Sequence, residues 1–502
     1  MRTRTRTRAR RRNAAAVGLA AALTGGLTLT AGAAAPDAQA ARQAAQHAPQ
    51  QVREDFNGDG YQDLAIGAPG TYGQDSSSGY VAVVYGSPTG LDPATRTVLG
   101  QHSPGVPGTA ERGDLFGHRL VARDLDGDGL TDLAVSSPGE SRANPAGSGS
   151  VTVLWGARSG LSGQGSVVVD PGEDETYGVG DDLTGGDFDG DGAQDLLMFR
   201  GEARGYSVLR GPFTRAGAPA SESPVELTTG DSYVQSLAAG DVTGDGADDL
   251  FVLQSFEEMG RGTRFFAGGE DGLTARGALL PSAATGAVGD FDKDGFGDFA
   301  YRAVPGGVVE NLPYDSGTVK VVHGTASGPG TRTAAFTQAT AGVPGTSEEG
   351  DQFGATLSAA DVNGDGYDDL AAGVPFEAIG PKKAAGSAVL LRGARGGLTG
   401  TGAQAFHQDT AGVGGVAEAG DRFGGAVRLL DSSGDGKAGL AVSAPGENGG
   451  NGAVWSLRGA SGGLTATGSR SFGPGALGAP ATTARFGASF AGPAYAPLWE
   501  PS

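Results

Sequence analysis

One acidic nine-residue pattern occurs seven times in this chain of 502 residues. The first copy begins at Asp55, and later copies begin at Asp124, Asp187, Asp241, Asp290, Asp361 and Asp431. Side chains with oxygen atoms recur at positions 1, 3, 5 and 9, and Gly stands at position 6 of every copy. Hard oxygen ligands on one tight loop suit Ca²⁺, and the backbone carbonyl of position 7 would complete the ligand set. The pattern therefore predicts calcium-binding loops.

The predicted ligands come from positions 1, 3, 5, 7 and 9 of the first six copies. They are Asp55, Asn57, Asp59, Tyr61, Asp63, Asp124, Asp126, Asp128, Leu130, Asp132, Asp187, Asp189, Asp191, Ala193, Asp195, Asp241, Thr243, Asp245, Ala247, Asp249, Asp290, Asp292, Asp294, Phe296, Asp298, Asp361, Asn363, Asp365, Tyr367 and Asp369. Thr243 replaces a carboxylate in the fourth copy, and Ser433 and Gly439 replace two ligands in the seventh. We expect about five to six Ca²⁺ sites, with the fourth weaker and the seventh empty.

Two other structures share parts of this pattern. An EF-hand matches the first six positions, but it requires a helix on each side and Glu at position 12. Position 12 is occupied here by Ile66, Val135, Met198, Val252, Tyr301 and Ala372. The other alternative is a surface turn without metal. Seven copies in register favour the metal, because the 23 carboxylates at these positions would otherwise repel one another.

The segments between the loops predict short β-strands. The loop starts are 69, 63, 54, 49, 71 and 70 residues apart, which suits a unit of four short strands. A short apolar run follows each loop, as at residues 64–68, and a β-rich run ending in a Gly-rich turn comes next, as at residues 81–91. A Phe-Gly pair precedes some of the loops, as at Phe116, Phe353 and Phe423. Together these elements predict four antiparallel strands per repeat.

The order of Phe-Gly, acidic loop and Gly-Ala-Pro resembles the FG-GAP repeat of integrin α-chain propellers and their bacterial relatives. The resemblance covers about residues 55–490 and implies an all-β, seven-bladed β-propeller. Gly-Ala-Pro is replaced at residues 198–200, 252–254 and 300–302, but the acidic loops keep their register there, so these repeats also count as blades. A spare Phe-Gly segment at residues 485–491 is predicted to complete the first blade and to close the ring.

The predicted domains are a signal peptide at residues 1–40, a linker at 41–54, the propeller at 55–495 and a tail at 496–502. Seven Arg residues precede an Ala-rich apolar run, and Ala38-Gln39-Ala40 fits a cleavage site. A basic nucleic-acid-binding arm is the alternative, but the small-residue apolar run follows it directly. Without residues 1–40 the net charge changes from −21 to −27, which disfavours a nucleic-acid partner. The chain has no Cys and no later apolar run long enough to span a membrane. We expect a secreted protein, either free or bound at the cell wall.

The repeats occupy nearly all of the chain after residue 54, which leaves no room for a separate catalytic domain. We therefore predict a non-catalytic scaffold that binds an extracellular protein or glycan. A glycan-active enzyme (a polysaccharide lyase or hydrolase) and a purely structural exported protein are the alternatives. None of the five histidines (His47, His102, His118, His323 and His407) has zinc-like spacing. Nothing in the sequence indicates the oligomeric state.

The variable loops predict where a partner would bind. In a four-stranded antiparallel blade, the acidic loops share one face with the Gly-rich hairpins. The loops that differ between blades lie on the other face, and recognition commonly occurs in variable loops on a rigid scaffold. These loops cover residues 71–78, 104–114, 139–146, 256–261, 311–315, 343–351 and 376–383.

Overall fold

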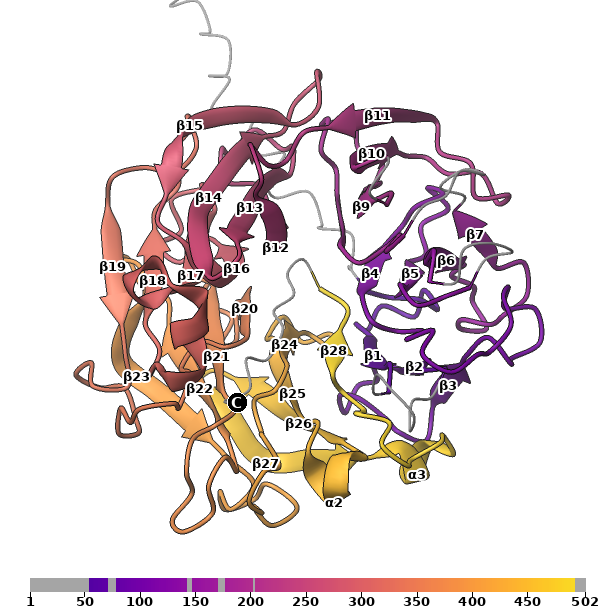
Figure 1. The fold of residues 1–502 in the computed structure, drawn as a ribbon. Helices are drawn as coiled ribbons and strands as arrows, with labels where there is room; N and C mark the ends of the chain where they lie inside the picture. Colours follow the sequence, from indigo (N-terminus) through magenta and orange to yellow (C-terminus); the bar gives the residue numbers. More distant parts are fainter. Residues whose placement is uncertain (1–53, 71–77, 142–146, 170–176, 202–203, 493–502) are drawn as a thin grey trace, which may run out of the picture. The chain divides into compact units, whose positions relative to one another are not determined.

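The computed structural model describes residues 54–70, 78–141, 147–169, 177–201 and 204–492 (Figure 1). The predicted signal peptide, the linker up to residue 53 and the predicted tail lie outside these residues. The chain divides into two units, residues 1–51 and 52–502, and the second unit contains all of the described structure. No helix among the described residues is both long and apolar enough to cross a membrane.

The described strands form seven antiparallel sheets of four strands each. The first sheet consists of β28 (Ser489–Phe490), β1 (Leu64–Ala68), β2 (Tyr80–Val84) and β3 (Arg96–Leu99). The second contains β4 (Leu120–Arg123), β5 (Asp132–Ser137), β6 (Ser150–Leu154) and β7 (Val167–Val169). The third contains β8 (Leu183–Gly186), β9 (Asp195–Phe199), β10 (Tyr206–Arg210) and β11 (Ser221–Val225).

The remaining four sheets also follow chain order. The fourth contains β12 (Tyr233–Gly240), β13 (Asp249–Phe256), β14 (Met259–Ala267) and β15 (Thr274–Leu280). The fifth contains β16 (Ala283–Gly289), β17 (Asp298–Ala303), β18 (Val319–Val322) and β19 (Thr333–Phe336). The sixth contains β20 (Leu357–Ala360), β21 (Asp369–Val374), β22 (Ser387–Arg392) and β23 (Thr399–Phe406). The seventh contains β24 (Val427–Leu430), β25 (Gly439–Ala444), β26 (Ala453–Ala460) and β27 (Gly463–Phe472).

Helix is confined to short connections in the described residues. The 3-10 helices η1 (Pro305–Gly307) and η2 (Val309–Tyr314) lie between β17 and β18. The helix α2 (Glu447–Gly450) lies between β25 and β26, and α3 (Pro474–Leu477) follows β27. The acidic loops therefore connect strands, and the helices that an EF-hand requires do not flank them.

The sheets follow one another as the blades of a propeller (Figure 1). From the second sheet to the seventh, the first strand of one sheet contacts the first strand of the next, in the pairs β4 with β8, β8 with β12, β12 with β16, β16 with β20 and β20 with β24. The hydrophobic core lies between neighbouring sheets, where Val81 of β2 packs in one cluster with Phe116 and Leu133 of the second blade. The prediction of seven blades is confirmed, and it includes the middle repeats that lack Gly-Ala-Pro.

Each Phe-Gly pair forms a buried turn before the first strand of its blade. Phe116, Phe353, Phe423 and Phe486 are all fully buried. Phe116 forms a parallel bridge with Gly79 of the preceding blade, and Phe423 forms the same bridge with Gly386. In the third blade Val179 takes this place, since it bridges Gly149 in the same way. Val179 is fully buried there, so an apolar side chain other than Phe fills this position in the third blade.

The C-terminal segment closes the ring as predicted. Within the first sheet β28 pairs antiparallel with β1, with Phe490 opposite Ile66 and Ser489 opposite Gly67. Further backbone hydrogen bonds extend the pairing, because Ala491 N–H donates to Ala65 at 3.1 Å and Gly487 N–H donates to Gly67 at 3.0 Å. The first blade thus takes its innermost strand from the opposite end of the chain.

Candidate functional sites

Each acidic loop is held in its turn by hydrogen bonds from its own backbone to its carboxylates. In all seven loops the carboxylate at position 1 accepts the backbone N–H of the Gly at position 6, at 2.7 to 3.0 Å. That Gly has a positive φ, for example 90° at Gly60, which other residues rarely adopt. The carboxylate at position 5 accepts the N–H of position 7, as Asp59 does from Tyr61 at 3.0 Å. These local bonds direct the carboxylates of one loop toward a common centre.

The Asp at position 9 joins its loop to the blade. One oxygen of Asp63 accepts the N–H of Phe56 at 2.9 Å, and the other accepts the N–H of Gly86 in the following hairpin at 2.8 Å. Asp132, Asp195 and Asp369 make the same two bonds in their own blades. These contacts place the hairpin between the third and fourth strands beside the acidic loop. We call this the acidic face of the propeller, and the other side the opposite face.

Position 8 links neighbouring loops, a role that the sequence analysis missed. Thr131 N–H donates to the carbonyl of Asp55 in the preceding blade at 3.0 Å, and Asp55 N–H donates to Thr131 Oγ1 at 3.1 Å. Asp368 makes the same reciprocal pair with Asp290. Position 8 varies in residue type, so its recurrence is hidden in the sequence. The acidic loops form a connected series and are not seven independent sites.

Carboxylates of three loops converge within the described residues. Potential ligand oxygens lie within 4.8 Å of one another in three groups: Asp124, Asp126 and Asp132; Asp187, Asp189 and Asp195; Asp290, Asp292 and Asp294. Asn57 and Asn363 replace one carboxylate in the first and sixth loops, and Thr243 replaces one in the fourth. Each of these side chains supplies an oxygen, so the predicted ligand type is kept.

Burial of these carboxylates makes ionisation costly without a cation. Burial raises the pKa of Asp63 to about 8, although backbone N–H groups of Gly86 and Phe56 oppose the shift. Burial also raises the pKa of Asp132 and of Asp195 to about 7 each. A divalent cation would favour the ionised forms and offset this cost. The raised pKa values therefore fit sites that are completed by a metal.

Two buried ligand atoms lack partners in the described structure. Thr243 Oγ1 and Asp292 Oδ1 are enclosed and accept no hydrogen bond from another described residue. Both atoms belong to position 3 of their loops. Buried polar atoms without partners are uncommon in folded proteins. Their presence, together with the oxygen donor set, shows that the loops fit a hard divalent cation.

Arginines partly neutralise four of the loops. Arg210 lies 3.1 Å from Asp189, and Arg392 lies 3.2 Å from Asp369. Arg215 pairs with Asp126 and Asp128, and Arg332 pairs with Asp292. The expectation of strong self-repulsion without metal is therefore too simple, because these guanidinium groups already supply positive charge. A cation at these loops would compete with an arginine.

The seventh loop keeps the turn, but it contains a positively charged lysine. Gly436 N–H still donates to Asp431 at 2.7 Å. Lys437 at position 7 lies 3.8 Å from the Asp435 carboxylate. Position 9 is Gly439, which offers no side-chain ligand. The lysine adds positive charge to this loop, and the empty seventh site stays a prediction.

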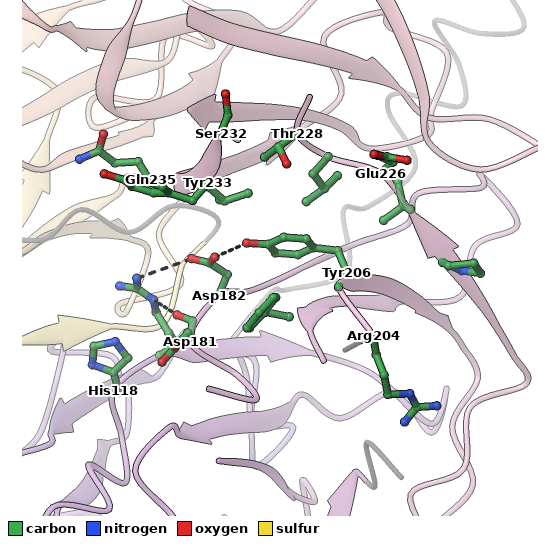
Figure 2. A pocket seen from close by; sticks show the side chains of 17 residues that line it. His118, Asp181, Asp182, Arg204, Tyr206, Glu226, Thr228, Ser232, Tyr233 and Gln235 are labelled. Carbon is green, nitrogen blue, oxygen red and sulfur yellow. Dashed lines mark hydrogen bonds and ion pairs between the residues drawn. The ribbon is translucent and has the colours of Figure 1, made fainter. Parts of the chain in front are cut away.

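A cavity of about 840 Å³ opens on the opposite face, between the second, third and fourth blades. Its lining includes Arg119 before β4, Asp181 and Asp182 before β8, Tyr206 at the start of β10 and Tyr233 at the start of β12 (Figure 2). The lining residues at β4, β8 and β12 lie at the opposite ends of these strands from the acidic loops. Among the described residues, the variable loops predicted to bind a partner contribute none of the lining. Most of loop 71–78 and the second part of loop 139–146 lie outside the described residues.

The wall of this cavity carries an ordered polar group. Tyr206 OH donates to Asp182 at 2.7 Å, Arg119 Nε donates to the carbonyl of Asp181 at 3.0 Å, and Arg119 also lies 3.9 Å from the Asp182 carboxylate (Figure 2). Burial and the charge of Asp182 raise the pKa of Asp181 to about 6. Burial, with Arg119 nearby, lowers the pKa of His118 to about 3. The sequence analysis found no such cluster, because its residues come from separate blades.

Three aromatic rings also line the cavity, those of Phe199, Tyr206 and Tyr233. Phe199 and Tyr206 pack with ring centroids 5.1 Å apart. Tyr233 is half exposed, and its hydroxyl donates to the carbonyl of Glu257 at 3.0 Å, which holds the ring in place. A concave site with aromatic surface and a few fixed polar groups is typical of ligand-binding pockets.

Comparisons with known proteins agree with the fold. The FG-GAP repeat model matches residues 52–84, 116–154 and 353–391. Phosphatidylinositol-glycan-specific phospholipase D of Rattus norvegicus is 34% identical over 159 residues, which cover 31% of this chain and 19% of that protein. Integrin alpha-IIb of Homo sapiens is 32% identical over 179 residues (36% and 16%), and integrin alpha-PS2 of Drosophila melanogaster is 29% identical over 228 residues (40% and 15%). The chain thus spans less than a fifth of the length of each relative.

Seven four-stranded blades with a C-terminal closing strand define a seven-bladed β-propeller. Three of its segments match the FG-GAP repeat model, and parts of the chain are similar to integrin alpha chains and to phosphatidylinositol-glycan-specific phospholipase D.

Proposed function

We propose that this chain is a secreted, calcium-binding propeller that acts as a non-catalytic scaffold for binding an extracellular protein or glycan. The observation that carries the binding role is the cavity on the opposite face. Its volume of about 840 Å³ and its mixture of aromatic and charged groups suit a polar ligand with some apolar surface. Arg119, Asp181 and Asp182 would select the ligand by charge and hydrogen bonding, and Tyr233 would supply a flat contact surface.

Calcium would stabilise the scaffold from the acidic face. The ligands at positions 1, 3, 5, 7 and 9 of the first six loops would hold the ions. A bound ion would neutralise the carboxylates and lock each loop, and the reciprocal bonds between position 1 and position 8 would pass that restraint to the next blade. Ligand binding and metal binding would then occupy separate faces, which permits independent tests of the two.

Secretion is supported by the charged and apolar character of residues 1–40. Expression of the full chain in a secreting host should yield a product that begins at Ala41. N-terminal sequencing of that product, or its absence from the medium, tests this part of the proposal.

The binding role is tested with the matched variants Tyr233→Ala and Tyr314→Ala. Both tyrosines are half exposed, but only Tyr233 lines the cavity. Wild-type protein would be screened against glycan arrays and extracellular protein fractions, and each hit would be titrated with both variants. We expect Tyr233→Ala to weaken binding at least about tenfold and Tyr314→Ala to leave it unchanged. Equal binding by both variants would contradict the proposal that the ligand binds in the cavity.

A second candidate, a glycan-active enzyme, is favoured by one observation. Asp181 lies beside Asp182, and its pKa of about 6 suits a general acid near neutral pH. Any glycan that binds would be incubated with wild type and with Asp181→Asn, and the products would be analysed by mass spectrometry. Cleavage by wild type that is lost in Asp181→Asn would favour the enzyme. Binding without cleavage would favour the scaffold.

A further inference from the structure

His323 lies directly beside the fifth acidic loop. It follows β18, and its side chain is 6% exposed. His323 Nδ1 is 3.0 Å from Asp298 Oδ1 and 3.5 Å from Asp292 Oδ2. The Asp292 and Asp298 side chains are equally enclosed, with 5% and 1% exposed. His323 lies outside the nine-residue pattern, so the structure adds a nitrogen donor that the pattern does not contain.

Several atoms of this cluster have unused bonding capacity. His323 Nδ1, Asp292 Oδ1 and Asp298 Oδ2 are buried and have no hydrogen-bond partner among the described residues. His323 Nδ1 lies 3.0 Å from Asp298 Oδ1 but forms no hydrogen bond with it. Buried polar atoms of this kind carry a desolvation cost unless something binds them. Three such atoms in one cluster indicate a missing partner.

Asp298 also differs from its counterparts in the other loops. In five loops Oδ2 of the position-9 Asp accepts the backbone N–H of position 2. Asp298 Oδ2 has no partner in the described structure. The residue corresponding to His323 in the other blades is Tyr85, Trp155, Arg210, Ala267, Arg392 or Arg458. Among the seven blades, the fifth alone therefore presents an imidazole to its acidic loop.

We propose that Asp292, Asp298 and His323 bind a divalent transition metal such as Zn²⁺, which would replace the calcium that the repeat pattern predicts at the fifth loop. Their potential ligand atoms all lie within 4.8 Å of one another. Ca²⁺ is bound in proteins by oxygen, whereas imidazole nitrogen together with carboxylate oxygen suits Zn²⁺ and its neighbours. The site is independent of whether the remaining loops hold calcium.

Arg332 is the competitor of the metal at this site. Its guanidinium lies 2.5 Å from Asp292 Oδ2, and a second nitrogen donates to the carbonyl of Gly396 at 2.6 Å. The Arg332 side chain is half exposed, so it can move into solvent without uncovering the core. A metal would take over the positive charge beside Asp292, and removal of Arg332 should tighten metal binding.

The test uses the full chain after removal of metals with a chelator, returned to excess Ca²⁺. Zn²⁺ is then titrated in by calorimetry with a competing chelator, and Co²⁺ serves as a spectroscopic probe of nitrogen ligation. We expect one Zn²⁺ site in wild type, a loss of affinity of at least about tenfold in His323→Gln, and tighter binding in Arg332→Gln. His102→Gln, which alters an exposed histidine, is the control for adventitious binding and should match wild type.

Two results would overturn the site. One is unchanged Zn²⁺ affinity in His323→Gln, and the other is unchanged or weaker affinity in Arg332→Gln, which decides the matter if His323→Gln does not fold. A wild-type protein whose melting temperature does not change with calcium would instead count against calcium in the other loops. A Zn²⁺ site that survives such a loss would show that the two proposals fail separately.

Discussion

Gln62 of the first acidic loop and Asp431 of the seventh are joined by two hydrogen bonds across the closing point of the ring. Gln62 N–H donates to the carbonyl of Asp431 at 3.3 Å, and Asp431 N–H donates to Gln62 Oε1. This is the same reciprocal pair that links Asp55 to Thr131, so the first and seventh loops are joined like neighbours within the chain. The ring is closed on its acidic face by this pair and inside the first blade by β28.

Crowding of the β28 closure should destabilise the propeller. A Cβ added at Gly67 would overlap Ser489 Oγ and the carbonyl oxygen of Gly117. Gly67→Ala should therefore lower the free energy of unfolding by about 1 to 3 kcal/mol. Gly462→Ala is the matched control, because nothing lies within 4 Å of the added Cβ. Deletion of residues 484–502 should act in the same direction and expose two strand edges to aggregation. Unchanged melts for Gly67→Ala and for the deletion would contradict closure by β28.

Calcium should raise the melting temperature by many degrees. Extracellular modules bind Ca²⁺ with dissociation constants of about 0.1 to 1 mM, so about 1 mM free ion should add roughly 0.4 to 1.4 kcal/mol per occupied loop. Several loops together would contribute as much as the net stability of an ordinary domain. Calorimetric melts with calcium and with chelator measure this contribution, and identical melts in the two conditions would refute it.

The loops should contribute unequally to this calcium-dependent shift. Asp126 belongs to a loop with carboxylates at all four ligand positions, whereas Asp435 lies in a loop that has only two. Asp126→Ala should therefore reduce the shift more than Asp435→Ala. Each variant is melted with calcium and with chelator, so that any calcium-independent loss cancels. Equal reductions in the two variants would contradict the ranking.

In chelator, the protein should be more stable at pH 5 than at pH 8. Burial holds the pKa of Asp63 at about 8 and those of Asp132 and Asp195 at about 7, all above the value of 3.8 for an exposed Asp. At pH values between 3.8 and these raised pKa values, the folded state binds more protons than the unfolded state, so the free energy of unfolding falls as the pH rises. Bound calcium requires the ionised carboxylates and should flatten or reverse this slope. Melting temperatures across the range, with and without calcium, provide the measurement; a rise in stability toward pH 8 in chelator would contradict the argument.

The bond between neighbouring loops should be measurable at Thr131. Thr131→Val keeps the shape of the side chain but leaves the buried N–H of Asp55 without its acceptor. We expect a loss of about 1 to 3 kcal/mol. Thr401→Val, on the exposed part of β23, is the matched control and should change stability by less than about 0.5 kcal/mol. Equal effects of the two substitutions would show that the reciprocal pair does not couple the blades.

The sequence by itself determined the number of blades, the acidic loops and the closing strand. The bonds that shape one loop, such as Gly60 to Asp55, join residues five positions apart, so they follow from local sequence and turn chemistry. The spare segment around Phe486 was recognisable because the first repeat begins at its acidic loop and lacks that element. A repeated sequence pattern predicts the structural elements that all blades share.

Only the tertiary structure decided which distant side chains meet. His323 reaches Asp298 because β17 and β18 pair in one register, with Phe299 opposite Val322. Arg119 and Asp182 meet because two blades pack side by side, although 62 residues separate Arg119 from its backbone acceptor at Asp181. Such contacts depend on strand register and on the packing of whole blades, and no local pattern encodes either one. The scaffold that all blades share could therefore be predicted from the repeats. The features that distinguish individual blades depend on how the blades pack.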